Sequence, residues 1–142
     1  MPLFTIGYEG MRIDDFLDKM QQEKIELVVD VRALPLSRKR GFSKTALAAA
    51  LTQVGIRYAH RVALGTPKPI RARYKHDHDF AALRVEFEKY LANQTLSLQQ
   101  LVELVRDTRA CLLCFEADPA LCHRSLVADA AMALGAPPAT HL

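Results

Sequence analysis

The chain has 142 residues, half of them hydrophobic and a quarter charged. This length suits a single domain over residues 1–142, and the composition excludes a disordered chain, a fibre and a small disulfide-stapled scaffold. The formal net charge is +3, no apolar run is long enough to cross a bilayer, and no secretory signal accompanies the three cysteines. We therefore expect a cytoplasmic protein with free thiols and no membrane partner.

Apolar runs alternate with amphipathic segments along the chain. In chain order we predict a strand at Leu3–Gly7, a helix from Asp14 to about Gln22, a strand at Glu26–Val31, a basic loop at Arg32–Phe42, a helix that Ser43 caps and Gly55 ends, a strand at Ile56–His60, a long loop at Arg61–His78, helices at Phe80–Leu91 and from Ser97 to Val105, a strand at Cys111–Phe115, and a last helix from Asp118 to Leu134. The tail can add an edge strand through Thr140–Leu142.

This alternation predicts an α/β fold, namely a single-domain, Rossmann-like three-layer sandwich with a mainly parallel sheet of four to five strands. Ligands of such folds bind beyond the carboxyl ends of the strands. The rule places the functional residues directly after Gly7, Asp30, His60 and Cys114.

Charge is strongly segregated along the chain. Residues 31–76 contain no Asp or Glu and hold eleven of the nineteen basic residues. If these charges share one face, the segment predicts a partner that carries phosphate, either a small molecule or a nucleic acid. The alternative is a solvated surface on which acids from other segments neutralise the bases.

The densest cluster of reactive side chains spans residues 114–124, where a buried strand leads into a helix. A helix start favours anions and lowers the pKa of a nearby thiol. The sequence therefore suggests Cys122 as a nucleophile, His123 as an acid or base, and Arg124 as a clamp for phosphate. Strand alternation puts Cys114 and Glu116 on one face, so Glu116 could be a general base or an ion-pair partner of Arg124.

Structural roles compete with these assignments. Cysteines in central strands are commonly inert, which is the interpretation we favour for Cys111 and Cys114, whereas Cys122 could serve either role. Cys114, Cys122 and His123 could supply metal ligands, but no paired cysteine spacing supports a site, so we predict no metal and no cofactor. Phosphatase, Walker, dinucleotide-binding and Ser-His-Asp hydrolase patterns are absent.

A second cluster follows the strand that ends near Val31. Asp30 could orient Arg32 or an attacking water, or could form a buried ion pair that fixes the loop. Arg38, within a run of three basic residues, could contact phosphate. Tyr8 and Glu9 follow the first strand and complete the predicted pocket, with Tyr8 as a platform on which a base could stack.

These motifs, taken in order, resemble the domain of unknown function 488 family. The matching pieces are Phe4–Gly10, Val29–Arg32, Pro35 with Ser37–Lys39 and Gly41–Ser43, Gly55–Tyr58 with His60, Leu64–Gly65, Cys114 with Glu116 and Cys122–Arg124, and Gly135 with His141–Leu142. The chain departs from the pattern at Tyr8, where many relatives have histidine, and at Thr66, where many have glycine. The resemblance implies a small cytoplasmic α/β domain and supplies no reaction.

The leading hypothesis is an enzyme acting on a phosphate-bearing substrate, a nucleotide or a nucleic acid. In this hypothesis Arg32 and Arg124 bind phosphate, Glu116 or Asp30 is the general base, and Cys122 is a nucleophile or a polar wall. The first alternative is a non-catalytic nucleic-acid-binding module that uses residues 31–76. The second is a thiol redox sensor that uses Cys114 and Cys122.

Overall fold

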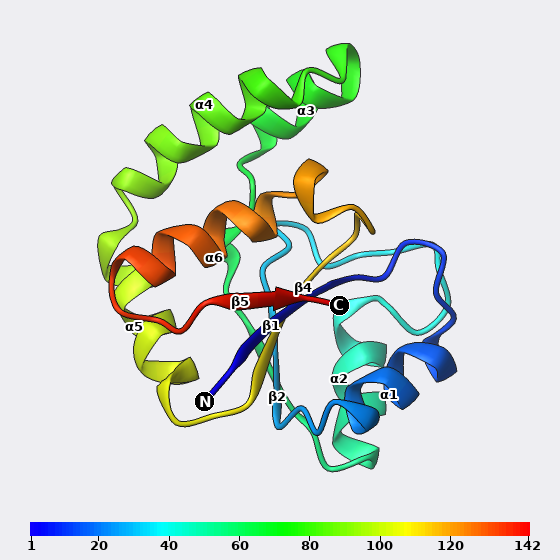
Figure 1. Cartoon of the computed structure of the whole chain (residues 1–142). Coiled ribbons are helices and arrows are strands. Elements are labelled where there is room, and N and C mark those ends of the chain that lie inside the picture. The colour runs from blue at the N-terminus through cyan, green and yellow to red at the C-terminus, as the bar shows by residue number, and fades with distance from the viewer.

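The computed structural model describes residues 1–142 and contains a five-stranded parallel sheet with the strand order β3-β2-β4-β1-β5 (Figure 1). In chain order the elements are β1 (Leu3–Gly7), α1 (Ile13–Gln22), β2 (Leu27–Asp30), α2 (Lys44–Gln53), β3 (Arg57–His60), the 3-10 turn η1 (Val62–Leu64), α3 (Lys68–Asp77), α4 (Phe80–Ala92), α5 (Thr95–Arg106), β4 (Ala110–Cys114), the 3-10 turn η2 (Pro119–Leu121), α6 (His123–Ala133) and β5 (Ala139–His141). The predicted α/β class and parallel sheet are confirmed, including the edge strand.

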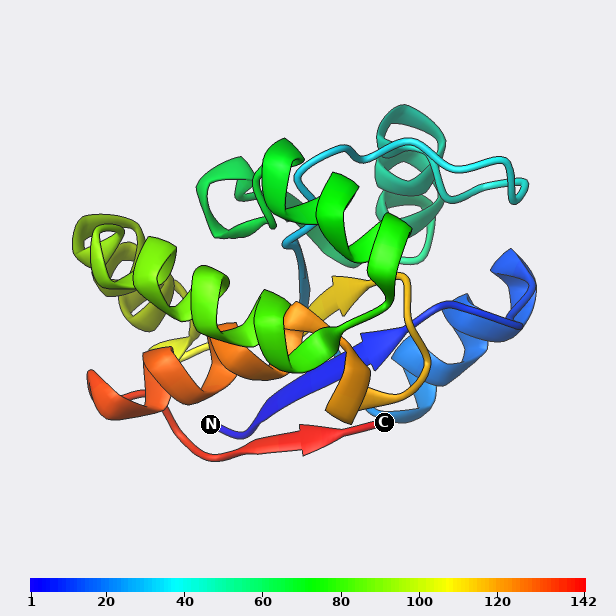
Figure 2. The same ribbon diagram turned by 90° about the horizontal axis from the view of Figure 1, so that it is seen from above.

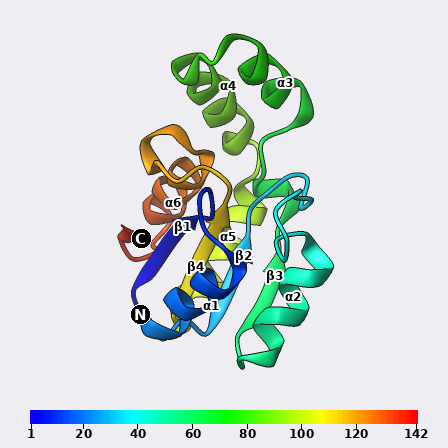
Figure 3. The same ribbon diagram turned by 90° about the vertical axis from the view of Figure 1, so that its right-hand side faces the viewer.

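Helices cover both faces of this sheet. Helices α1 and α2 lie on one face and α5 and α6 on the other, while α3 and α4 form a hairpin beside the end of the sheet (Figure 3). The same arrangement is visible from above in Figure 2. Each face has its own apolar core, one around Phe16 and Phe42 and a larger one around Leu101 and Leu112.

The central strands are apolar on both sides because both of their faces are covered. Every residue of β2 and β4 is buried, and their sequences are Leu-Val-Val-Asp and Ala-Cys-Leu-Leu-Cys. Such continuous apolar runs are typical of parallel strands with helices on both faces. Asp30 is the only charged residue among them, and it needs partners inside the protein.

The connections that follow the neighbouring strands β1 and β4 run to opposite faces of the sheet. The chain leaves β1 for α1 on one face of the sheet and leaves β4 for α6 on the other. The two strands are neighbours, and their last residues, Gly7 and Cys114, are paired in the register. A parallel sheet binds ligands where the connections diverge in this way, beyond the carboxyl ends of the strands.

The predicted long loop at Arg61–His78 is wrong, because this segment forms η1 and α3. None of the residues of α3 is buried, so the helix has no apolar stripe that periodicity could detect. Its start does follow a known pattern, since Pro67 is the N-cap and Pro69 lies in the first turn.

Two helix starts also differ from the prediction. Helix α5 begins at Thr95, so Ser97 lies inside the helix and does not cap it. The last helix is interrupted, because η2 ends at Leu121 and Cys122 has extended backbone angles before α6 begins at His123. Cys122 is therefore the N-cap of α6.

The helices are short or polar, and none combines the length and apolar character that a membrane-spanning helix requires.

Candidate functional site

A pocket of about 530 Å³ lies at the carboxyl end of the sheet, beneath the α3–α4 hairpin. It is formed by residues at or after the ends of β1, β2 and β4, by one face of α3, and by the starts of α4 and α6. Its lining includes Tyr8, Arg32, Ala33, Leu34, Leu36, Ser37, Thr66, Arg71, Tyr74, Lys75, His78, Phe80, Leu83, Cys114, Phe115, Glu116, Leu121 and His123. The volume is within the range usual for sites that bind small molecules.

Two glycines allow backbone segments to meet closely at this end of the sheet. A Cβ atom on Gly7 would lie 1.7 Å from the carbonyl oxygen of Glu116, and one on Gly65 would lie 2.3 Å from the backbone nitrogen of Ala33. Only a residue without a side chain fits either position. Gly7 therefore lets the segment after β1 pack against the loop that carries Glu116.

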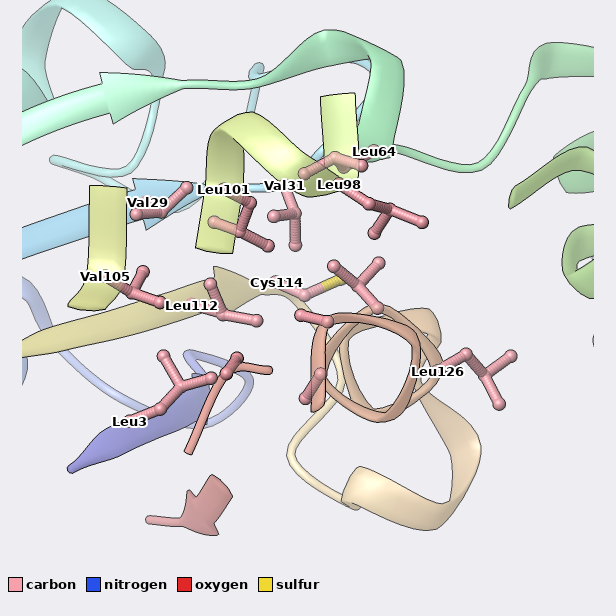
Figure 4. Close-up of a cluster of buried hydrophobic side chains, with 14 of the residues drawn as sticks. Leu3, Val29, Val31, Leu64, Leu98, Leu101, Val105, Leu112, Cys114 and Leu126 are labelled. Atoms are coloured by element: carbon pink, nitrogen blue, oxygen red, sulfur yellow. The ribbon is translucent and has the colours of Figure 1, made fainter. Parts of the chain in front are cut away.

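The floor of the pocket contains a thiol, a carboxylate and an imidazole in contact. The Sγ atom of Cys114 lies 3.4 Å from Glu116 Oε2 and 3.3 Å from His123 Nδ1. Cys114 ends β4 and His123 begins α6, so the strand-to-helix connection brings these groups together. Cys114 packs between Val31 and the residues of α6 (Figure 4). Its single thiol proton can satisfy only one of these two acceptors at a time.

The ring of His123 is held in a fixed orientation. Its Nε2 atom lies 2.7 Å from the carbonyl oxygen of Val31, and the side of the ring packs edge-on against Phe87. A carbonyl oxygen only accepts hydrogen bonds, so Nε2 carries a proton and Nδ1 is the atom whose protonation changes. Burial acts to lower the pKa of His123, but the hydrogen bonds to Cys122 and to Val31 outweigh it and raise the pKa above its ordinary value.

Cys122 lies behind this floor and does not line the pocket. Its Sγ atom is 4.0 Å from His123 Nδ1, and only 1% of the residue is exposed. Burial, followed by its contact with Cys114, raises the pKa of the Cys122 thiol despite its position at a helix start. Both features weigh against the predicted nucleophile role, because the reactive species is an accessible thiolate.

Arg124 is fully buried and holds the loop after β4 in place. Its guanidinium donates to the main-chain carbonyl oxygens of Glu116 and Ala117 and to the hydroxyl of Thr5. The alternative of an ion pair with the Glu116 carboxylate is wrong, because Arg124 contacts the Glu116 backbone and forms no salt bridge. Arg124 also lies outside the pocket lining, which weighs against its predicted contact with phosphate.

Glu9 also acts on this loop. Its Oε1 atom accepts a hydrogen bond of 3.0 Å from the backbone nitrogen of Ala117, and it does not line the pocket. The backbone nitrogen of Glu9 donates to the carbonyl oxygen of Phe115 at 2.8 Å. Glu9 and Arg124 therefore position Glu116 from two sides.

Asp30 and Arg32 form a buried ion pair with every side-chain oxygen occupied. Asp30 Oδ1 accepts from the backbone and the Nε atom of Arg32, and Oδ2 accepts from Arg32 Nη2 at 2.7 Å and from the Tyr58 hydroxyl at 2.5 Å. Arg32 Nη1 donates to the carbonyl oxygen of Phe42 and to the Tyr8 hydroxyl. Asp30 is 0% exposed and lies outside the pocket lining, which weighs against its predicted role as a general base.

The pKa values of this second group follow from its pairing. Burial lowers the pKa of Arg32, but Asp30 outweighs burial and raises it, so the guanidinium stays charged. Burial and the hydrogen bond to Asp30 raise the pKa of Tyr58. Arg32 lines the pocket with most of its donors already used, and Tyr8 stacks on Phe42 with ring centroids 4.3 Å apart. The predicted stacking surface of Tyr8 is thus partly taken by the protein.

Sequence reasoning missed the side of the pocket that α3 forms. Arg71, Tyr74, Lys75 and His78 all line it, and they lie at helical spacings of three, four and seven residues. Arg71 donates to the Thr66 carbonyl oxygen at 2.9 Å, and neither Arg71 nor Lys75 has a carboxylate partner. The proline start was the one local signal for a helix here, and no apolar stripe accompanies it.

Most of the basic segment remains free of acidic partners. Of its eleven basic residues only Arg32 and Arg73 are in ion pairs, with Asp30 and with Asp77 and Glu86. Arg38 is exposed in the loop between β2 and α2 and does not line the pocket. The positive charge of this segment is therefore available at the α3 face and in that loop.

Two atoms of the floor and one atom behind it are close enough to share a metal ion. The Sγ atoms of Cys114 and Cys122 and a ring nitrogen of His123 all lie within 4.8 Å of one another. Cys111, the third cysteine, is fully buried in β4 outside this group, and burial raises the pKa of its thiol.

Comparison with known protein families gives one finding. A family model described as "Domain of unknown function DUF488" matches residues 12–131, most of the chain. The matched region contains the Asp30–Arg32 pair and the whole of the pocket floor, while β1 with Tyr8 precedes it. No curated protein and no solved structure matches the chain.

Proposed function

Because this chain belongs to the DUF488 family, which is described only as a domain of unknown function, we propose a function from the site itself. The protein is an enzyme that acts on a phosphate-bearing small molecule, and a nucleotide is the substrate class that fits best. One observation carries the proposal: reactive side chains and unpaired cations face each other across a single pocket at the carboxyl end of the sheet.

The pocket has the chemical components that such a substrate needs. Arg71 and Lys75 supply positive charge at its rim, and Tyr74, Phe80 and Phe115 supply flat apolar surface. Glu116 is the only acidic residue in the lining. A nucleotide presents an anionic end and a flat aromatic end, so both kinds of surface would be used.

The roles within the pocket follow from position. Arg71 and Lys75 bind the phosphate, and Glu116 is the general base because its half-buried carboxylate reaches the pocket. His123 and Cys114 form the polar floor next to Glu116. Glu9 and Arg124 are positioning residues that hold the loop on which Glu116 lies.

A non-catalytic nucleic-acid-binding module is the second candidate, because exposed cations extend beyond the pocket to the loop that carries Arg38. We place it second because the pocket is concave and its floor holds a thiol, a carboxylate and an imidazole in contact. The redox alternative is weaker, since Cys122 does not line the pocket and burial raises the pKa of its thiol.

Binding measurements distinguish the two candidates. A fluorescent mononucleotide and a labelled short oligonucleotide are titrated into the protein at several salt concentrations. The enzyme proposal expects saturable mononucleotide binding with a mild salt effect. Oligonucleotide binding that collapses with salt and resists competition by mononucleotides would instead support the nucleic-acid module. Absence of any binding at low salt would contradict both.

Catalysis is tested separately on a panel of nucleotides and sugar phosphates, with product formation followed by chromatography. Glu116→Gln should abolish the turnover that the wild-type chain shows. The matched control is Glu103→Gln, which makes the same change at an exposed position on α5. Equal turnover by Glu116→Gln and the wild type would contradict the assignment of the base.

A further inference from the structure

We propose that Cys114, Cys122 and His123 bind a zinc ion at the floor of the pocket. The proposal depends on this cluster alone and would hold even if the substrate class proposed above were wrong. It gives Cys122 a role that its exclusion from the pocket lining otherwise leaves open.

The distances within the cluster match those of a zinc site. Tetrahedral zinc, with bonds of roughly 2.3 Å to sulfur and roughly 2.0 Å to nitrogen, holds a sulfur and a nitrogen ligand roughly 3.5 Å apart. His123 Nδ1 lies 3.3 Å from Cys114 Sγ and 4.0 Å from Cys122 Sγ. All three ligand atoms lie within 4.8 Å of one another, so small side-chain rotations would place an ion between them.

The histidine is also oriented as a metal ligand is. Its Nε2 atom donates to the carbonyl oxygen of Val31 at 2.7 Å, which leaves Nδ1 directed at the two sulfur atoms. A backbone carbonyl on the second ring nitrogen is the usual support of a metal-bound histidine, because it fixes the ring and the tautomer. The edge-on contact with Phe87 holds the ring from the side.

Charge balance favours a divalent cation here. The cluster is buried in the larger apolar core, where an isolated thiolate would be costly. Zinc binding displaces the two thiol protons and any proton on Nδ1 into solvent, and two thiolates then neutralise the ion. Two sulfur ligands with an imidazole are a donor set that selects zinc over magnesium or calcium.

The fourth position of the ion would face the pocket. Cys114 and His123 line the pocket while Cys122 lies behind them, so the open side of the cluster is the side on which Glu116 and substrate lie. Three protein ligands with an open fourth position are typical of catalytic zinc sites, whereas structural sites are closed by four. A water on the zinc would lie near the Glu116 carboxylate, which is 3.4 Å from Cys114 Sγ.

The first test measures metal content in the full chain. The wild-type protein is supplied with zinc, passed through gel filtration and analysed by elemental mass spectrometry, and we expect a single zinc ion per chain. Cys122→Ala should retain none, and the matched control Cys111→Ala, which changes a buried cysteine outside the cluster, should retain the wild-type amount. No retained zinc in the wild type, or equal retention by the two variants, would overturn the proposal.

A second test uses cobalt in place of zinc and needs only the wild-type chain, so it remains valid if Cys122→Ala fails to fold. Cobalt bound by the wild-type chain should show thiolate-to-metal charge-transfer absorption, and a chelator should remove it. The same chelator should expose Cys114, which lines the pocket, but not Cys111, to alkylation, as read by peptide mass spectrometry. Cobalt binding without that absorption would overturn the site. So would a Cys114–Cys122 disulfide as the only product when the protein is incubated with cobalt in air.

Discussion

Two polar clusters lie at the same end of the sheet, and they differ in how completely their groups are paired. The first cluster is Asp30, Arg32 and Tyr58 at the end of β2 and on β3, where both carboxylate oxygens of Asp30 are occupied. The second is Cys114, Glu116 and His123 after β4, where one thiol proton faces two acceptors and the pocket is open beside them.

From this difference we infer a structural role for the first cluster and propose a functional role for the second. A buried charge is retained when its partners satisfy it fully, as the ion pair of Asp30 and Arg32 does. A cluster with unused donors and acceptors next to a pocket can instead bind a metal or a substrate. Both clusters contain an acid near a strand end, so residue type alone does not distinguish them.

The largest expected effect comes from breaking the paired cluster. Arg32→Leu leaves the Asp30 carboxylate buried without its cation and should lower the free energy of unfolding by about 3–5 kcal/mol, as measured by urea denaturation. Replacing both residues, in Asp30→Leu with Arg32→Leu, removes the unpaired charge as well. The double variant should therefore be more stable than the single one, and a less stable double variant would contradict the explanation.

A smaller loss is expected where the second cluster is supported by close backbone contact. Gly7→Ala places a Cβ atom 1.7 Å from the Glu116 carbonyl oxygen, so the loop after β4 must move. We expect a loss of about 1–3 kcal/mol in the free energy of unfolding. Gly55→Ala cannot serve as the control, because the φ of Gly55 is +77° and alanine would be strained there. Ala46→Gly on α2 is the control, since it measures the usual difference in stability between alanine and glycine. A Gly7→Ala variant with wild-type stability would mean that this contact is absent.

In the presence of a chelator, the stability of the protein should also fall at alkaline pH. Burial raises the pKa of the Cys111 and Cys122 thiols, so the folded chain holds their protons more tightly than the unfolded chain. Their contribution is fully present below the unfolded thiol pKa of roughly 8.5 and is lost as the pH rises above it. Each thiol should reduce stability by about 1.4 kcal/mol per pH unit in that range. Cys111→Ala should flatten the profile, and an unchanged slope would contradict the assignment.

The central strands of the sheet were predictable from sequence because they are short, buried runs between helix signals. The fully buried sequences of β2 and β4 are examples. Helix α3 was not, since it buries no residue and shows no apolar stripe. The amphipathic pattern reports burial, so a helix that packs its polar residues around a pocket escapes it.

The site residues divide in the same way. Tyr8, Arg32, Cys114, Glu116 and His123, which the sequence places at or after strand ends, all line the pocket. The sequence could not show that the Arg124 guanidinium donates to backbone carbonyl oxygens, or that both carboxylate oxygens of Asp30 have hydrogen-bond partners. Both features depend on how side chains pack across separate segments of the chain. Whether Cys122 or His123 lines the pocket also depends on the residue at which α6 begins, and no local sequence pattern reveals that residue.

The most direct test compares one variant from each region by unfolding with and without a saturating fluorescent mononucleotide. Tyr58→Phe removes a hydrogen bond from the paired cluster and should lower stability by about 1–2 kcal/mol while keeping the stabilisation by nucleotide. Lys75→Gln should keep wild-type stability and lose the stabilisation by nucleotide, because it removes a cation at the pocket rim. Lys68→Gln, on the same helix but outside the pocket, is the control and should resemble the wild type. The account would be contradicted if Lys75→Gln were stabilised as strongly as the wild type, or if Tyr58→Phe alone lost the stabilisation by nucleotide.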